Sequence, residues 1–204
     1  MFDSTLLKLV AITDDLRDGR DGLVTRAQAA ARGGTTMVQL RLKDADARTL
    51  VEVARALISA LPVPVIVNDR VDVALAACAA GVHVGADDLP VAAVRRLAPP
   101  EFIVGASVGC DAEVAGSRGA DYVGIGPVYA TTSKLDAGQA IGVMEFARLA
   151  QACAVPAVAI GGITPDRVAP LMAAGASGVA VIRAVFSAAD PERAARAMRH
   201  ATET

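Results

Sequence analysis

The chain has 204 residues, of which 53% are hydrophobic and only 3% aromatic, and its formal net charge is −2. This length suits one domain, with a core of Ala, Val, Leu and Ile that needs no disulfide or structural metal. The small negative charge excludes the overall basic field that holds a nucleic-acid backbone. Any recognition of phosphate must therefore be local.

The cysteines and the apolar runs indicate where the protein works. Its three cysteines are odd in number and widely spaced, which favours a reducing cytoplasm over a disulfide framework. The start of the chain carries Asp3 and too short an apolar run for a signal peptide. No apolar run approaches the ~18 residues of a membrane span. We expect a cytoplasmic protein without membrane or nucleic-acid partners. Assembly into a homo-oligomer is left as an open possibility.

Short runs rich in β-branched residues alternate with helical patterns at a repeat of ~25 residues. Continuous apolar strands in such a series predict a parallel sheet covered by helices. We expect one catalytic domain over residues 1–204, a closed (β/α)8 TIM barrel of the α/β class, with an open doubly wound sheet as the alternative. The expected strands are 8–13, 36–41, 63–68, 81–85, 102–107, 121–126, 155–161 and 178–183.

Several expected strands follow a helix ending that contains glycine. These endings are ARGG before the second strand, AAG before the fourth, SRGA before the sixth and MAAGAS before the eighth. Glycine readily adopts the left-handed conformation that closes a helix, so we expect it to do so at each ending. In such barrels the chemistry lies where strands end and the following loops begin, and the candidate site residues cluster there.

Three hydrogen-bond donors, Gln39, Arg41 and Lys43, lie two residues apart at the end of the second strand. This spacing places them on one side of an extended segment. A solvated strand end is the simpler interpretation. However, only three of the 20 basic residues are lysines, so lysine is not the ordinary surface cation of this chain. Its compact charge suits a phosphate.

Acidic residues follow the next two strands. Asn68 and Asp69 close the third strand, and Asp87 and Asp88 follow the fourth. They could serve only as turn and cap residues. Adjacent strands lie ~4.8 Å apart, however, so Asp69 and one later acid can face each other, and their repulsion favours a cation. Carboxylates with water and substrate phosphates predict Mg²⁺. We expect His83, inside the strand pattern, to be a hydrogen-bonded residue of the core or behind the site rather than a ligand.

Two loops complete the candidate site. The segment GIGPVYATTSKLDAGQAIG is long for so economical a barrel and carries Lys134, which favours a lid or binding loop. The segment AIGGITPDR offers the backbone amides of Gly161 and Gly162, with Thr164 as a cap and Pro165 in the next helical turn. Phosphate sites in such barrels commonly use the loops after strands seven and eight.

Together these segments resemble the thiamine phosphate synthase family over nearly the whole chain. The resemblance rests on VQLRLKD, VNDRVDVAL, GVHVGADDLP, IVGASV, ADYVGIGPVYATTSK and VAIGGITPDRV, in that order. It implies a Mg²⁺-dependent transferase of thiamine biosynthesis. Its small-molecule substrates would be 4-amino-2-methyl-5-(diphosphooxymethyl)pyrimidine and a thiazole phosphate, and its products thiamine phosphate and diphosphate. In that family the diphosphate departs first, and the thiazole nitrogen then captures the pyrimidine carbocation.

The resemblance also implies roles for individual residues. The aminopyrimidine diphosphate would be bound by Gln39, Arg41, Lys43, Asn68, Ser107 and Lys134. Asp69 and Asp88 would hold the Mg²⁺ ion. The thiazole phosphate would be surrounded by Thr131, Ser133, Gly162, Ile182 and Arg183. Of these, Arg41, Ser107 and Lys134 are expected to be catalytic, in a site that stabilises the leaving charge and excludes water.

The chain departs from the family pattern at a few positions. Ala86 replaces a usual Gln, Ser133 the second Thr of Thr-x-Thr-Lys, Arg183 a usual Ser, and Val108-Gly109 a usual Thr-His. These changes bear on substrate fit more than on the reaction. Two alternatives stay open. One is a thiazole tautomerase, an isomerase on the same barrel that tends to lack both acids and to carry His at the position of Pro127. The other is a non-catalytic barrel that binds a phosphorylated ligand.

Overall fold

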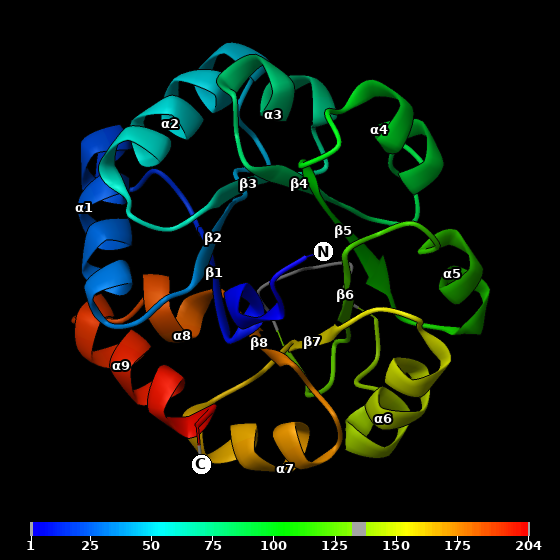
Figure 1. Ribbon diagram of the computed structural model, residues 1–204. Coiled ribbons are helices and arrows are strands. Elements are labelled where there is room, and N and C mark those ends of the chain that lie inside the picture. The colour runs from blue at the N-terminus through cyan, green and yellow to red at the C-terminus, as the bar shows by residue number, and fades with distance from the viewer. Residues whose placement is uncertain (1, 132–137, 204) are drawn as a thin grey trace.

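A computed structural model describes residues 2–131 and 138–203, and in this part of the chain eight parallel strands close into a barrel (Figure 1). Each strand pairs with its neighbours in sequence, and β8 pairs with β1. This confirms the predicted (β/α)8 barrel and excludes the open sheet. The strands are Leu9–Ile12 (β1), Met37–Leu40 (β2), Val65–Asn68 (β3), Gly81–Val84 (β4), Ile103–Val108 (β5), Tyr122–Ile125 (β6), Ala157–Ile160 (β7) and Gly178–Val181 (β8).

Helices surround the barrel, and α9 lies against α1 to complete the ring (Figure 1). Within the described residues, no helix combines the length and apolar character that crossing a bilayer demands. The helices are α1 (Gly19–Arg32), α2 (Ala47–Ala60), α3 (Val71–Ala77), α4 (Val91–Leu97), α5 (Asp111–Gly116), α6 (Gly142–Ala152), α7 (Val168–Ala173), α8 (Arg183–Phe186) and α9 (Pro191–Ala201), with 3₁₀ turns η1 (Ser4–Leu7) and η2 (Pro165–Arg167).

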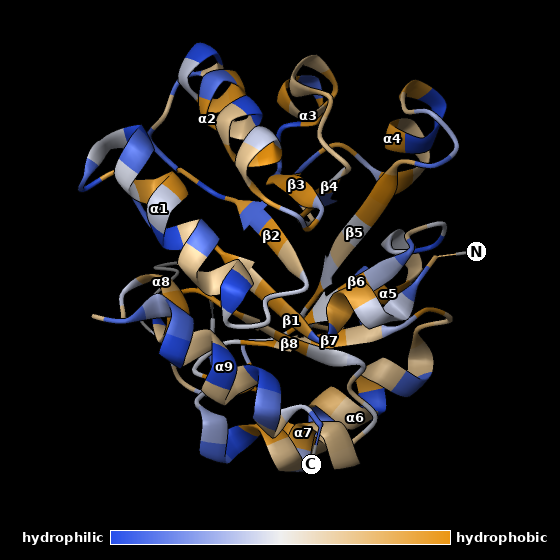
Figure 2. Ribbon diagram, turned by 60° about the vertical axis from the view of Figure 1, so that its left-hand side comes forward, coloured by the Kyte–Doolittle hydropathy of each residue, from blue (hydrophilic) through white to orange (hydrophobic). Residues whose placement is uncertain are grey.

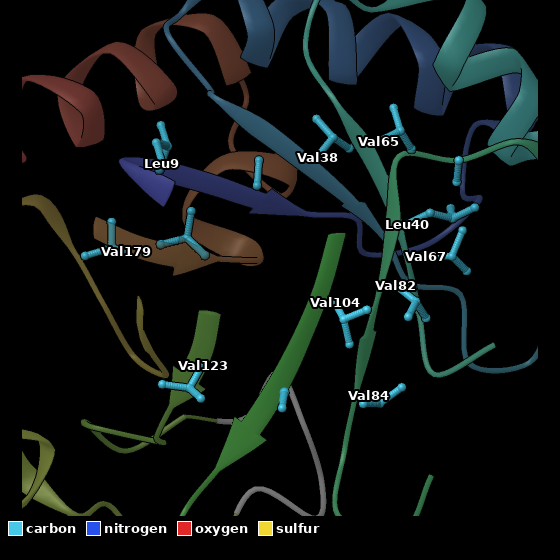
Figure 3. Packing of buried hydrophobic residues seen from close by; sticks show 14 of the residues in the cluster. Leu9, Val38, Leu40, Val65, Val67, Val82, Val84, Val104, Val123 and Val179 are labelled. Atoms are coloured by element: carbon cyan, nitrogen blue, oxygen red, sulfur yellow. The ribbon is translucent and has the colours of Figure 1, made fainter. Parts of the chain in front are cut away.

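Side chains alternate along the strands between an outer apolar layer and the barrel interior. Leu9 and Ala11 of β1 belong to the large cluster between strands and helices, whereas Val10 and Ile12 belong to the cluster inside the barrel. Figure 3 shows members of the outer cluster on most of the strands. In Figure 2, the first part of β5 is strongly hydrophobic, while α1 and α9 mix hydrophobic and hydrophilic residues, as helices with one solvated face do. Inward positions therefore repeat every second residue, and those near the carboxyl ends of the strands contribute to the site.

At the amino ends of the strands, the barrel is filled by side chains and covered by η1. Met37, Ile66 and Tyr122 are buried inside it, and η1 adds Leu7. The Phe2 ring stacks on Tyr122 with a centroid distance of 6.1 Å. Figure 1 shows η1 lying across the middle of the ring of strands. The barrel interior is thus closed at the amino ends of the strands and can open only at the carboxyl ends.

Every strand lies within two residues of its predicted bounds, and the difference at the end of β8 bears on the site. The predicted strand extends to residue 183, but β8 ends at Val181. At Ile182 the backbone turns out of the sheet, with φ −103° and ψ −84°, and Arg183 begins α8. The predicted placement of Arg183 at a strand end was therefore wrong. Strand β5, in contrast, runs one residue further than predicted, to Val108.

The predicted left-handed glycines are present before three strands but not before β4. Gly34, Gly119 and Gly175 have φ of 101°, 89° and 94°. Gly81 instead lies within β4, where an added Cβ would collide with the backbone carbonyl of Ile103. Cys78, with φ 56°, takes the left-handed position that ends α3. The glycine signal before β4 thus reflected close strand packing, not a helix end.

Gly178→Ala is expected to lower the free energy of unfolding by about 2 kcal/mol or more. An added methyl group at the start of β8 would overlap the backbone of Leu7 and Lys8, which is tied to β1. Gly116→Ala is the matched control, because a methyl group at the end of α5 meets nothing within 4 Å. The control should be neutral or stabilise by up to about 1 kcal/mol. Urea unfolding measures both variants, and equal midpoints would contradict the packing argument.

Candidate functional site

A cavity of about 1190 Å³ opens at the carboxyl ends of the strands and extends into the barrel. It is larger than the ~300–1,000 Å³ usual for one small ligand, so it has room for two. All predicted site residues that the structure describes line this cavity. They are Gln39, Arg41, Lys43, Asn68, Asp69, Asp88, Ser107, Thr131, Gly162, Ile182 and Arg183. The other two predicted residues, Ser133 and Lys134, lie outside the described residues.

The inward side chains at the ends of β2 and β3 are joined directly. Gln39, only 4% exposed, donates from Nε2 to Asn68 Oδ1 at 2.7 Å. This bond fixes the orientation of both amides and leaves each with further donor or acceptor capacity. The pair can therefore present fixed hydrogen-bonding groups to a ring in the cavity.

Arg41 carries an unused hydrogen-bond donor. Its backbone is held by Thr13, whose Oγ1 accepts from the Arg41 N–H at 2.8 Å and donates to the Arg41 carbonyl at 3.0 Å. Nη2 of its guanidinium is buried and has no hydrogen-bond partner among the described residues. An unpaired buried donor is costly, especially on a charged group, and an anion would satisfy it. Arg41 thus favours an anionic ligand.

The two predicted acids stand on the rim beside β3 and β4. Asp69 has a left-handed backbone, φ 63°, which is uncommon for a residue other than glycine, and its N–H donates to the His83 carbonyl at 2.8 Å. Such strain gathers at functional sites. Asp88 is half-buried, and its Oδ2 accepts from the Gly85 N–H at 2.7 Å. Both carboxylates line the cavity.

The donor set at this rim suits a hard cation. The described residues contain no group of three or more His, Cys, Asp and Glu side chains placed to hold a metal. An ion bound by Asp69 and Asp88 would therefore complete its shell with water or ligand oxygens. Mg²⁺ binds in this way, whereas structural zinc takes four protein ligands, mostly Cys and His.

The imidazole of His83 lies inside the barrel between two hydroxyl groups. Its Nδ1 is 3.0 Å from the Tyr122 hydroxyl, and its Nε2 is 3.0 Å from Ser107 Oγ. This confirms the predicted hydrogen-bonded histidine. His83 lies behind Ser107, a residue expected to contact substrate, and all three side chains border the cavity.

Two glycines and two arginines line the side of the cavity that follows β7 and β8. Gly162 has φ 62°, and a Cβ there would lie 2.5 Å from the Ala130 carbonyl oxygen, so only glycine fits against the loop after β6. Arg167 Nη1 donates to the Gly162 carbonyl at 2.8 Å, and its guanidinium lies 4.7 Å from the centre of the Tyr129 ring. Arg183 lies exposed at the start of α8.

Arg167 lies on this side and was not among the predicted site residues. The TPDR segment was interpreted through Thr164 as a cap, but Thr164 makes no capping bond with its side chain, and the turn after it is the three-residue η2. The arginine at the end of the same motif was the signal, because η2 turns it back over the cavity. The described positions that depart from the family pattern also line the cavity; they are Ala86, Val108, Gly109 and Arg183.

Comparisons with known proteins identify the family of this chain. The family model described as thiamine monophosphate synthase matches residues 9–185. The thiamine-phosphate synthase of Xanthobacter autotrophicus is 48% identical over 200 residues, covering 96% of this chain and 95% of that protein. The thiamine-phosphate synthase of Moorella thermoacetica is 47% identical over 195 residues, covering 93% and 92%. The chain belongs to the thiamine monophosphate synthase family.

A solved structure within this family has the same barrel. The thiamine phosphate pyrophosphorylase from Pyrococcus furiosus aligns with a TM-score of 0.87 at 36% identity, covering 98% of this chain and 97% of that one. A 3-hexulose-6-phosphate synthase aligns with a TM-score of 0.73 but only 18% identity, covering 95% and 99%. The second likeness shows the fold alone, whereas the first extends family similarity along nearly the whole chain.

Inorganic diphosphate is expected to raise the midpoint of thermal unfolding by several degrees, because Arg41 offers a buried donor that no described residue pairs with. At about 100 times its Kd a ligand adds about 2.7 kcal/mol, and about 1 kcal/mol shifts a domain of this size by 2–4 °C. Arg41→Met should remove most of this shift. Arg32→Met is the control, since Arg32 is exposed at the far end of α1. Scanning fluorimetry at constant ionic strength measures the shift, and its full retention in Arg41→Met would exclude Arg41 from the anion site.

Proposed function

We propose that this chain is a thiamine-phosphate synthase, a transferase that joins 4-amino-2-methyl-5-(diphosphooxymethyl)pyrimidine to a thiazole phosphate and releases diphosphate. The observation that carries the proposal is that one cavity brings several groups together. These are the amide pair, the cations of β2, the two carboxylates, and the wall of Gly162 with two arginines. Membership of the family and the named relatives support the same transferase activity over an isomerase.

The β2–β5 side of the cavity suits the aminopyrimidine diphosphate. The Gln39–Asn68 pair offers oriented amide groups to a heteroaromatic ring. Arg41 and the exposed Lys43 offer positive charge to the diphosphate, and charge-assisted bonds of this kind are the stronger ones. Lys134, outside the described residues, is proposed to join them. The ring and its leaving group would thus be held by different residues along one wall.

We propose Mg²⁺ as the cofactor, held by Asp69 and Asp88 together with diphosphate oxygens. The support is the donor set, two carboxylates on one rim with no third metal-binding side chain gathered there in the described part of the chain. When bound, the ion would supply charge that offsets the negative charge developing on the leaving diphosphate.

The β7–β8 side suits the thiazole phosphate. Gly162 keeps this wall free of side-chain bulk, and Arg167 and Arg183 supply two cations. Thr131 and Ile182 border the same space, and Ser133 is proposed to do so from outside the described residues. Because this phosphate does not react, its binding should contribute equally to the ground state and the transition state.

The proposed reaction breaks the C–O bond between the pyrimidine methylene carbon and the diphosphate, and forms a C–N bond from the thiazole nitrogen to that carbon. Arg41, Lys43 and Lys134 stabilise the departing charge, while Ser107 orients the pyrimidine. An apolar floor excludes the water that would otherwise capture the carbocation. This floor is formed by Val10, Ile12, Val158, Ile160 and Ala180.

An assay with both substrates, with and without EDTA, tests this function. Thiamine phosphate should form only when divalent metal is present. Turnover of the thiazole phosphate alone would indicate the tautomerase, and binding without turnover the ligand-binding barrel. The chain keeps both acids and has Pro127 where the tautomerase pattern carries His. We further propose a cytoplasmic location, which the three free cysteines favour.

Asp88→Asn is expected to lower kcat/KM for the pyrimidine substrate about a hundredfold or more. The amide removes the charge proposed to hold Mg²⁺, yet its oxygen can still accept from the Gly85 N–H. Asp87→Asn, the neighbouring acid on the same rim, is the matched control and should keep near wild-type activity. Turnover across a Mg²⁺ titration measures both variants. Wild-type activity and metal dependence in Asp88→Asn would refute the metal assignment.

Arg183→Ala is expected to raise KM for the thiazole phosphate by about tenfold, with kcat little changed. A guanidinium–phosphate contact is worth about 1.5–3 kcal/mol and acts equally before and during reaction. Arg183→Lys keeps the charge without the planar fork and should give an intermediate value. Both constants are measured with the pyrimidine substrate saturating. An unchanged KM in Arg183→Ala would place this side chain in solvent.

A further inference from the structure

A hydrogen-bonded chain runs up the inside of the barrel from its closed end to the cavity. Phe2 stacks on Tyr122, the Tyr122 hydroxyl bonds to His83 Nδ1, and His83 Nε2 bonds to Ser107 Oγ, each bond being 3.0 Å long. Tyr122 is 2% exposed, whereas His83 and Ser107 are half-buried. The chain therefore links a fully buried phenol with a hydroxyl that borders the cavity.

Two glycines make room for this chain. A Cβ on Gly105 of β5 would lie 2.5 Å from His83 Nδ1 and would collide with the Tyr122 ring. A Cβ on Gly124 would lie 3.1 Å from His83 Cε1. Gly105 pairs with both His83 and Tyr122 across the sheet, and Gly124 pairs with Ser107. The barrel thus leaves out side chains at two inward positions where the imidazole and phenol lie.

The direction of the hydrogen bonds follows from the buried phenol. Burial, together with the charge of Asp121, raises the pKa of Tyr122, so the phenol keeps its proton. Within the described residues, His83 Nδ1 is the one hydrogen-bond partner of the Tyr122 hydroxyl. If Nδ1 were protonated, the phenol proton would be buried without an acceptor, at a substantial cost. Tyr122 therefore donates to Nδ1.

The direction of the second hydrogen bond, between His83 and Ser107, then follows. A neutral imidazole that accepts at Nδ1 carries its proton on Nε2, and that proton is donated to Ser107 Oγ. Ser107 accepts through its oxygen, so its own hydroxyl proton remains available to a second acceptor. In the described part of the chain, Ser107 Oγ has no other bond, and the side chain lines the cavity.

We propose that His83 is a positioning residue for catalysis, set in its Nε2–H tautomer by Tyr122, which makes Ser107 present its hydroxyl proton to an acceptor atom of the pyrimidine substrate. This inference rests on the proposed function for the role of Ser107, whereas the tautomer itself does not. His83 acts through Ser107, so its contribution to turnover depends on the serine hydroxyl.

The tautomer is measured directly by NMR of histidine labelled with ¹⁵N in the whole protein. The chain has only two histidines, and His200 is exposed in α9, so His200→Gln leaves His83 as the one signal. The expected spectrum shows a protonated Nε2 and an unprotonated Nδ1. In Tyr122→Phe, which keeps the ring and removes the donor, the Nδ1–H form should increase. A protonated Nδ1 in the wild-type protein would overturn the proposal.

A double-mutant cycle tests the route through Ser107. With Ser107 present, His83→Leu should lower kcat/KM for the pyrimidine substrate about tenfold, and His83→Gln, whose amide can still donate to Oγ, should lose less. In the Ser107→Ala background, His83→Leu should change kcat/KM less than about twofold. Additive losses would show that His83 acts independently of Ser107 and would overturn the positioning role.

These experiments separate this proposal from the proposed function. If the protein forms no thiamine phosphate but His83 is the Nε2–H tautomer, the assigned reaction fails while the hydrogen-bond chain stands. If turnover is normal but the tautomer is Nδ1–H, the reaction stands and the positioning role fails. Should His83→Leu unfold, Tyr122→Phe still decides, because it is expected to shift the tautomer and lower kcat/KM severalfold together. A shift in neither would overturn the proposal.

Discussion

The strict alternation of side chains along eight closed parallel strands is the constraint on which this structure depends. Every second residue must point into a barrel whose interior has little volume. At the amino ends these positions are filled by Met37, Ile66 and Tyr122, with η1 across the opening. At the carboxyl ends the same register carries polar side chains and glycines instead. The cavity thus continues the barrel interior beyond the core, where apolar side chains do not fill the space.

Polar groups placed inside a barrel must satisfy one another, and here most of them do. Gln39 bonds to Asn68, and His83 bonds to both Tyr122 and Ser107. These bonds hold the side chains in position before any ligand arrives, which reduces the reorganisation needed on binding. The buried Nη2 of Arg41 is the exception among the described residues of this wall. A wall that is otherwise satisfied makes that donor a specific attraction for an anion.

The barrel and most of the site could be predicted because both follow from period and position. Apolar runs marked the strands. Gln39, Asn68 and Asp69 lie at strand ends, so they meet at one rim of the barrel whatever rotamers their side chains adopt. The predictions that were wrong or incomplete concerned residues placed by local turns of the backbone. The turn at Ile182 moved Arg183 into a helix, and η2 brought Arg167 over the cavity. Arg167 in η2 lies against the ring of Tyr129 from the loop after β6, and no local sequence pattern contains a contact of this kind.

The interior chain from Tyr122 to Ser107 shows a further limit of sequence patterns. Tyr122 begins an apolar strand and has the pattern of ordinary core, and Gly105 and Gly124 are unremarkable as strand glycines. Their meaning arises from register, because neighbouring strands place a missing Cβ beside a large ring. One glycine alone would weaken its strand. Two glycines facing one imidazole and one phenol instead exchange apolar packing for an oriented hydrogen-bond chain. The barrel gives up apolar contact beneath the site and gains a hydroxyl whose direction is fixed.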